Sequence, residues 1–245
     1  MMRPLAAHFL ADLRLLARMP AYTIPTLLLP SLFFLMFAGQ RIPRGVPTVV
    51  PVASFATFAV FGVVFFKFGV STAMDRAAPW TRYVRTLALA PGTVLAARAL
   101  SAVVFALLAA FAVFATARMT MAIGLAPVQL GRVLVGLLAG ALPFTLCGIA
   151  VGYWTSPRSA VAMANLLYLL LSYGGGLWTP PDLLPPGVRD VAVVLPTYHW
   201  GRVVWAAALA LPWRTADWLA LAAWTVVFGA AAWRGYVRDE GALYG

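Results

Sequence analysis

The chain has 245 residues, of which 63% are hydrophobic and 10% charged. A soluble domain carries charge on about a quarter of its residues, so the composition excludes a water-soluble globule and predicts an all-α protein that crosses a membrane several times. The net charge of +11 does not indicate nucleic-acid binding, because the arginines lie at the ends of apolar runs and in the loops between them, where they set topology and meet lipid headgroups.

Residues 1–20 are predicted to form an amphipathic helix that lies flat in the headgroup region. At about 100° per residue the apolar side chains share one side of this helix, and Arg14 and Arg18 fall nearly opposite. A plain basic topology signal explains the same arginines, and both roles can hold together. A cleaved secretory signal is disfavoured, because Pro25 and Pro30 interrupt the next apolar stretch and no cleavage site follows it.

Six apolar runs are predicted to be membrane-spanning helices, because they approach the ~20 residues that a crossing needs. They are residues 22–38, 49–70, 93–117, 130–151, 160–177 and 217–233. Six crossings put both termini on one side, and eleven of the 18 basic residues fall on that side, which favours cytoplasmic termini. The apolar run 203–211 is too short to cross. We interpret residues 1–245 as one transmembrane domain.

Lys67 is the lone lysine and a charge well inside a predicted span. A charge at the membrane centre costs about 2.5–3.5 kcal/mol on insertion scales, so such a residue often has a role. Lys67 also lies about two turns before Asp75, where its stem could snorkel to the cytoplasmic face. Every carboxylate falls at a span end or in a loop, which leaves proton-coupled transport without an obvious carrier group.

The polar segment 75–92 follows the second predicted span and is expected to hold a short helix with two different faces. Pro79 begins this helix and Pro91 with Gly92 ends it. Such a helix, held between two spans, can pass movement to a soluble partner, and an interfacial helix anchored by its aromatic residues fits the spacing too. The residues assigned to this candidate coupling segment are Asp75, Arg76, Trp80, Arg82, Tyr83, Arg85 and Leu87.

The stretch 171–186, LSYGGGLWTPPDLLPP, superficially matches the signature loop of nucleotide-hydrolysing ATPases. The chain contains no GxxxxGK[ST] phosphate loop. We therefore interpret the stretch as the end of an apolar helix, followed by a turn that two Pro-Pro pairs enforce. An aromatic belt at the outer face is the simple explanation for Tyr198 and His199.

The chain offers few groups for catalysis or metal binding. His8 and His199 lie far apart, Cys147 stands alone inside an apolar run, and the sequence has no HExxH motif, Cys/His cluster or nucleophile elbow. We expect no cofactor on this chain. A membrane-embedded enzyme or its anchor subunit, and a secondary carrier or channel, stay open as alternatives to a permease.

Four stretches, in this order, carry a family resemblance: LRLLARMPAYTIPTLLLPSLFFLMF, MDRAAPWTRYVRTLALAPGTVLAARAL, LLSYGGGLWTPPDLLPPGVRDVAVVLPTYHWGR and WTVVFGAAAWRGYVRDE. They resemble the permease subunits of type-2 ATP-binding-cassette (ABC) exporters, over essentially the whole chain. In that family the loop after the second span commonly has Glu-Arg followed by Gly and Thr, whereas Asp75 and Arg76 are followed by Ala-Ala-Pro-Trp. This departure indicates a different arrangement of the cytoplasmic contact.

The resemblance implies an export permease of a bacterial cytoplasmic (inner) membrane, without an ATPase of its own. It would pair with a second permease, identical or similar, and dock two ABC ATPase subunits, which hold the ATP and Mg²⁺. The segment 75–92 and the N-terminal helix with Arg14 and Arg18 would receive the ATPase stroke. Segment 178–216 would form re-entrant helices that close the outer end of the pathway. The residues assigned to this outer gate are Gly176, Pro180, Pro181, Leu184, Pro185, Pro196 and Tyr198.

Overall fold

The computed structural model describes residues 2–37, 45–78, 91–121 and 123–244. All regular elements of this described part are helices, which confirms the all-α prediction. In chain order they are α1 (Met2–Ala17), α2 (Pro20–Phe37), α3 (Val49–Ala77), α5 (Pro91–Met121), α6 (Pro127–Trp154), α7 (Pro157–Gly174), the 3₁₀ turn η1 (Pro181–Leu183), α8 (Pro186–Ala192), α9 (Pro196–Ala208) and α10 (Thr215–Tyr244).

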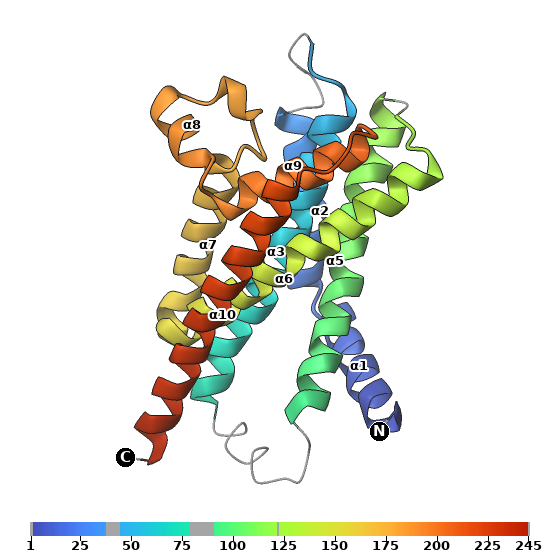
Figure 1. Cartoon of the computed structure of the whole chain (residues 1–245). Coiled ribbons are helices and arrows are strands. Elements are labelled where there is room, and N and C mark those ends of the chain that lie inside the picture. The colour runs from blue at the N-terminus through green and yellow to red at the C-terminus, as the bar shows by residue number, and fades with distance from the viewer. Residues whose placement is uncertain (1, 38–44, 79–90, 122, 245) are drawn as a thin grey trace.

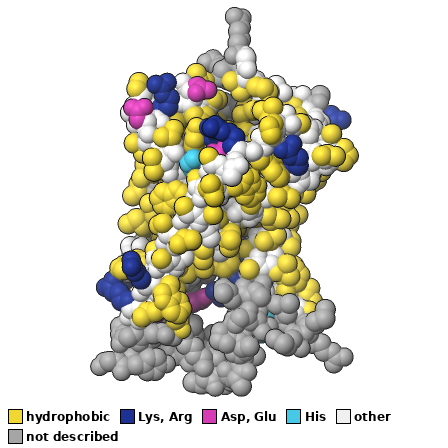
Figure 2. Space-filling view, viewed as in Figure 1, with side chains coloured by type: hydrophobic (Ala, Val, Ile, Leu, Met, Phe, Trp, Pro, Cys, Tyr) yellow, Lys and Arg dark blue, Asp and Glu magenta, His cyan; other side chains and the backbone are white. Residues whose placement is uncertain are grey.

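Within the described residues, four helices are long and apolar enough to cross a membrane. They cover 49–77, 97–121, 127–154 and 215–239. α2 and α7, of 18 residues each, pack against α3 and are not among these four helices. Figure 2 shows hydrophobic side chains over the middle of the molecule. Repeated membrane crossing is therefore supported, and the count of six stays a prediction.

The bundle has two different ends (Figure 1). We call one the terminal end, because it holds α1, the last turn of α3, the first turn of α5 and the last turn of α10. The other, the cap end, holds η1, α8 and α9. Both termini lie at the terminal end, as an even number of crossings requires. Which side of a membrane this end faces stays a prediction.

α3 is the central helix of the bundle. Its residues 51–61 are all buried, and it packs against α2, α5, α6, α7 and α9. Apolar side chains cover every side of it, which is the pattern of a helix that other helices enclose. Aromatic rings fill one of these contacts, where Phe58 of α3 stacks on Tyr168 of α7 with ring centroids 4.5 Å apart.

α3 and α6 approach each other closely because glycines line their contact. A Cβ atom on Gly148 would lie 2.7 Å from the Phe65 carbonyl oxygen, and one on Gly152 would lie 2.6 Å from the Gly69 carbonyl oxygen. Both distances are too short for any residue with a side chain. Gly148 and Gly152 form a Gly-x-x-x-Gly pair, a spacing that brings two helix backbones together in membranes. The pair therefore marks the face of α6 that meets α3.

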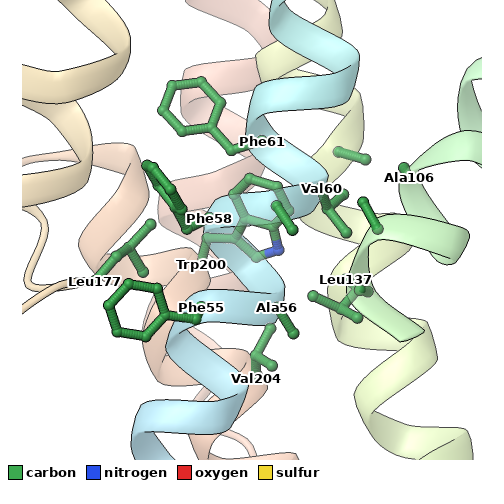
Figure 3. Close-up of a cluster of buried hydrophobic side chains, with 14 of the residues drawn as sticks. Phe55, Ala56, Phe58, Val60, Phe61, Ala106, Leu137, Leu177, Trp200 and Val204 are labelled. Carbon is green, nitrogen blue, oxygen red and sulfur yellow. The ribbon is translucent and has the colours of Figure 1, made fainter. Parts of the chain in front are cut away.

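α9 inserts a tryptophan into the core at the cap end. Trp200 has no exposed surface, donates from Nε1 to the Gly136 carbonyl at 2.9 Å and stacks on Phe144. Figure 3 shows its ring surrounded by side chains that include Phe61 and Leu137. The apolar run 203–211 is too short to cross, as predicted, and most of it belongs to this buried helix. Burial of the helix inside the cap end explains why it is apolar.

The contact between Gly140 and Trp200 can be tested with a matched pair of variants. A methyl group on Gly140 would overlap the Trp200 indole, whereas nothing lies within 4 Å of a methyl group on Gly131 of the same helix. We expect Gly140→Ala to lower the stability by about 1–3 kcal/mol, as overpacking does, and Gly131→Ala to leave it unchanged or slightly raised. Thermal unfolding in detergent, followed by tryptophan fluorescence, measures both. Equal midpoints for the two variants would contradict this packing.

Candidate functional site

The glycine cluster after α7 forms a tight turn against α9. The chain leaves α7 at Gly174, and Gly176 has a φ of +77°, a conformation that glycine adopts without strain. A Cβ atom on Gly175 would overlap Thr197, whose hydroxyl donates to the Leu171 carbonyl at 2.6 Å. The structure confirms that this stretch is the end of a helix, as the absence of a phosphate-loop motif predicted.

A cavity of about 520 Å³ opens at the cap end, bounded by the ends of α2, α3 and α7 and by α9 and the start of α10. Aromatic and proline side chains make up much of its wall, and Ser54, Asp182, Arg202, Arg214 and Asp217 add polar groups. The predicted gate residues that line it are Gly176, Pro180, Pro181 and Tyr198. This wall brings together residues that lie far apart in sequence.

The other predicted gate residues shape the segment without lining this cavity. Leu184 is buried, Pro185 directly precedes α8, and Pro196 is the first residue of α9. Proline suits the first turn of a helix, because its fixed φ fits there and its missing N–H group has no partner to lose. These residues therefore set where α8 and α9 begin.

A buried carboxylate organises the charged wall of the cavity. Asp217, at the start of α10, is 5% exposed and contacts Nδ1 of His199 at 2.8 Å and Nε of Arg202 at 3.2 Å. Nε2 of His199 lies 3.0 Å from the Val193 carbonyl. Both imidazole nitrogens thus lie within hydrogen-bond distance of an oxygen, one on α10 and one just after α8. Side chains of both charges gather with histidine in the upper part of the face in Figure 2.

Arg202 extends this cluster to a predicted gate residue. Its Nη1 donates to the Tyr198 hydroxyl at 2.9 Å, and its guanidinium lies over the Tyr198 ring. Burial lowers the pKa of Arg202, but Tyr198 and Asp217 outweigh burial and raise that pKa above its usual value. The guanidinium stays charged. The aromatic-belt explanation for Tyr198 and His199 is therefore incomplete, because both belong to an ion-paired cluster.

At the terminal end, two neighbouring residues of α3 bind different helices. Asp75 accepts from Nη1 of Arg98 on α5 at 2.7 Å. Arg76 lies 2.6–2.8 Å from the Asp239 carboxylate of α10, and its Nη1 donates to the Gly152 and Tyr153 carbonyls at the end of α6. A cation placed on the last carbonyls of a helix stabilises that helix end. The end of α3 is thereby linked to α5 on one side and to α6 and α10 on the other.

The remaining residues assigned to the candidate coupling segment lie outside the described residues. These are Trp80, Arg82, Tyr83, Arg85 and Leu87. Arg14 and Arg18, assigned to the N-terminal helix, are both exposed, and Phe9 and Leu13 on its apolar side are partly buried. These exposures agree with the predicted amphipathic character of α1, with basic residues outside and apolar residues toward the bundle.

The snorkelling explanation for Lys67 is wrong. Lys67 is 8% exposed, and its Nζ lies 2.6 Å from Oδ2 of Asp12 in α1 and 2.8 Å from Oγ of Ser101 in α5. The stem does not need to reach the surface, because a carboxylate reaches the ammonium inside the bundle. Asp12 lies outside the predicted spans, as expected, but α1 brings its carboxylate to Lys67 of α3.

The chain matches none of the models of known protein families. It is 26% identical over 213 residues to a Bacillus subtilis protein described as "Putative transport permease YvfS", and the match covers 83% of this chain and 85% of that protein. This chain is similar to a transport permease. The similarity spans most of both chains and agrees with the resemblance to permease subunits found in the sequence motifs.

Two candidate functional residues, Asp12 and Asp217, were not predicted from the sequence, although the position of Asp12 on its helix could have indicated it. On a helical wheel Asp12 falls on the apolar side of α1, one turn after Phe9. A carboxylate among apolar side chains predicts a buried partner, and Lys67 was the unpaired charge that needed one. The other candidate, Asp217, lies at the start of a predicted span, where its partners on α9 could not be identified from spacing.

The cap-end cluster can be tested by removing its carboxylate charge. We expect Asp217→Asn to lower the stability by about 2 kcal/mol, because Asp217 is buried and accepts from His199 and Arg202, and hydrogen bonds to charged groups have this magnitude. Asp190→Asn makes the same chemical change at an exposed position of α8 and should have no effect. Thermal unfolding of both variants in detergent measures the difference. A stable Asp217→Asn protein would show that the cluster does not hold α9 to α10.

Proposed function

We propose that this chain is the permease subunit of an ATP-driven exporter of the type-2 ABC class. The observation that carries the proposal is the similarity to a transport permease over 83% of the chain. The helical bundle adds support, because it has helices long enough to cross a membrane and two ends of different construction. Motion supplied at the terminal end can then open or close the cap end.

The terminal end is the proposed site of ATPase contact. Residues 79–90 begin three positions after Arg76, and the ion pairs of Asp75 and Arg76 reach α5 and α10. A displacement of this segment would therefore pull on several helices together. Packed helices respond to such a pull by rigid-body movement, because their cores deform little. We propose that this movement converts an inward-facing permease into an outward-facing one.

The cap end is the proposed outer gate. α9 is fixed by Trp200 in the core and by Thr197 against α7, and its ion pairs with Asp217 join it to α10. The cavity at the cap end is lined by α9, by the turn after α7 and by the start of α10. We propose that helix movement from the terminal end shifts α9 relative to α10 and releases the exported substrate on this side.

The proposed topology has six crossings and cytoplasmic termini. α2 and α7 would supply the two further crossings, since 18 helical residues span about 27 Å, close to the ~30 Å hydrocarbon layer. Exposed basic residues of the terminal end favour the cytoplasmic side. They include Arg14, Arg18, Arg158, Arg234 and Arg238. In a bacterium this places the protein in the cytoplasmic membrane.

ATP hydrolysis should depend on a second protein. We expect the purified chain to hydrolyse no ATP, and an ABC ATPase encoded beside its gene to be stimulated when the chain is added. Arg82→Glu combined with Arg85→Glu should abolish the stimulation and the co-purification of the ATPase, because both charges of the proposed contact are reversed. Arg118→Glu combined with Arg189→Glu, at exposed positions, is the matched control. Hydrolysis by the chain alone would contradict the proposal.

The assembly should contain two permease chains and two ATPase subunits, with ATP and Mg²⁺ on the ATPases. Native mass spectrometry of the co-purified complex in detergent measures this stoichiometry directly. A complex with one permease chain would contradict the proposed pathway between two permeases. Flux driven by an ion gradient without any ATPase, and lost in Lys67→Met, would instead identify a secondary carrier, and turnover of a substrate by the isolated chain would identify an enzyme.

A further inference from the structure

We propose that Asp12, Lys67 and Ser101 form an ionic clamp that makes α1 a moving part of the α3–α5 pair. The three side chains come from α1, α3 and α5 and converge on one point. Lys67 Nζ contacts Asp12 Oδ2 at 2.6 Å and Ser101 Oγ at 2.8 Å, and the Ser101 hydroxyl also contacts the same Asp12 carboxylate. An amphipathic helix that merely rests among headgroups needs no such contact.

Burial makes this clamp hard to open one partner at a time. Lys67 is 8% exposed and Ser101 has no exposed surface, so an ammonium that lost Asp12 would keep one hydroxyl as its polar contact. A charge left unpaired in apolar surroundings is strongly unfavourable. Asp12 is a quarter exposed, which places the clamp at the edge of the bundle where α1 lies. We infer that α1 follows Lys67 whenever α3 moves.

Neighbouring contacts join the clamp to the proposed coupling segment. Leu13, next to Asp12, packs against the hydrophobic core. One turn from Ser101 on α5, Arg98 pairs with Asp75 of α3. α3 and α5 are thus joined at two levels, by the Asp75–Arg98 ion pair near the ends that residues 79–90 connect and by the Lys67–Ser101 hydrogen bond further into the bundle. Movement of that connection reaches α1 through Asp75, Arg98 and the clamp.

Asp12 and Lys67 are positioning residues under this proposal, and their role in transport rests on the proposed function. α1 presents Arg14 on its exposed side, and Arg18 is exposed in the turn that follows α1. A helix held by the clamp offers these charges to the ATPase in a fixed position. Without the clamp, α1 would still bind the membrane through its apolar side but would lose its fixed position on α5.

The position of α1 can be measured without any transport assay. Spin labels at Leu10 of α1 and Leu108 of α5, both exposed, report the α1–α5 distance by double electron–electron resonance in nanodiscs, in a Cys147→Ser background. We expect a narrow distance distribution for the parent protein and at least a doubling of its width in Lys67→Met and in Asp12→Asn. The exchange Asp12→Lys with Lys67→Asp should narrow it again, and Asp190→Asn should leave it unchanged.

Lys67→Met is the decisive variant, because it removes the buried charge and leaves Asp12 free to turn to water. An unchanged distribution in folded Lys67→Met protein would overturn the clamp. The double variant Asp12→Asn with Lys67→Met tests it again with both charges gone, and a narrow distribution there would overturn it as well. Both variants can be checked for folding by gel filtration and by their thermal midpoints.

A second measurement tests the consequence for coupling. Stimulation of the partner ATPase should fall at least fivefold in Lys67→Met and stay unchanged in Asp190→Asn. A variant with a broadened α1–α5 distance distribution that still stimulates the partner ATPase as much as the parent protein does would overturn the role of the clamp in coupling. If the parent protein stimulates no ATPase, the proposed function fails, and the distance measurement still decides whether the clamp exists.

Discussion

The arrangement of this protein depends on one constraint: a charge inside an apolar bundle must meet its counter-charge within the protein. The described part of the chain satisfies it at three places, and each joins different helices. Lys67 brings α1 to α3 and α5, Arg76 brings α10 and α6 to α3, and Asp217 brings α9 to α10. Apolar burial alone would allow these helices to slide or rotate against one another, since lipid and core are similarly apolar. The ion pairs fix α1, α9 and α10 relative to the helices that they contact.

Much of the fold follows from local sequence signals. Long apolar runs predict α3, α5, α6 and α10, the glycines from 174 to 176 predict the end of α7, and the two Pro-Pro pairs predict the turn that follows it. These signals act over one or two helical turns, so they can be identified in a single sequence. The short buried helix α9 shows the limit, because its apolar character reflects enclosure by α3 and α6 rather than a membrane crossing.

The candidate site could be predicted only in part, because its contacts link residues far apart in sequence. Asp12 and Lys67 are 55 positions apart, and Arg76 and Asp239 are 163 apart. Spacing within a helix can show that Asp12 lies on an apolar side, but it cannot show which helix covers that side. The Tyr198 hydroxyl and His199 had a simple explanation as interfacial aromatics, and only the fold brings Arg202 and Asp217 to them.

The order of Asp75 and Arg76 has a consequence for the divergence of such chains. Consecutive residues of a helix point about 100° apart, so the acidic residue reaches α5 and the basic residue reaches α6 and α10. A chain with the two residues transposed would have the same composition, net charge and helix propensity. It would nevertheless present an arginine to Arg98 and an aspartate to the carbonyl oxygens that end α6. A sequence change that keeps composition, net charge and helix propensity the same would therefore still be destabilising at this dipeptide, because each side chain must point toward its own partner.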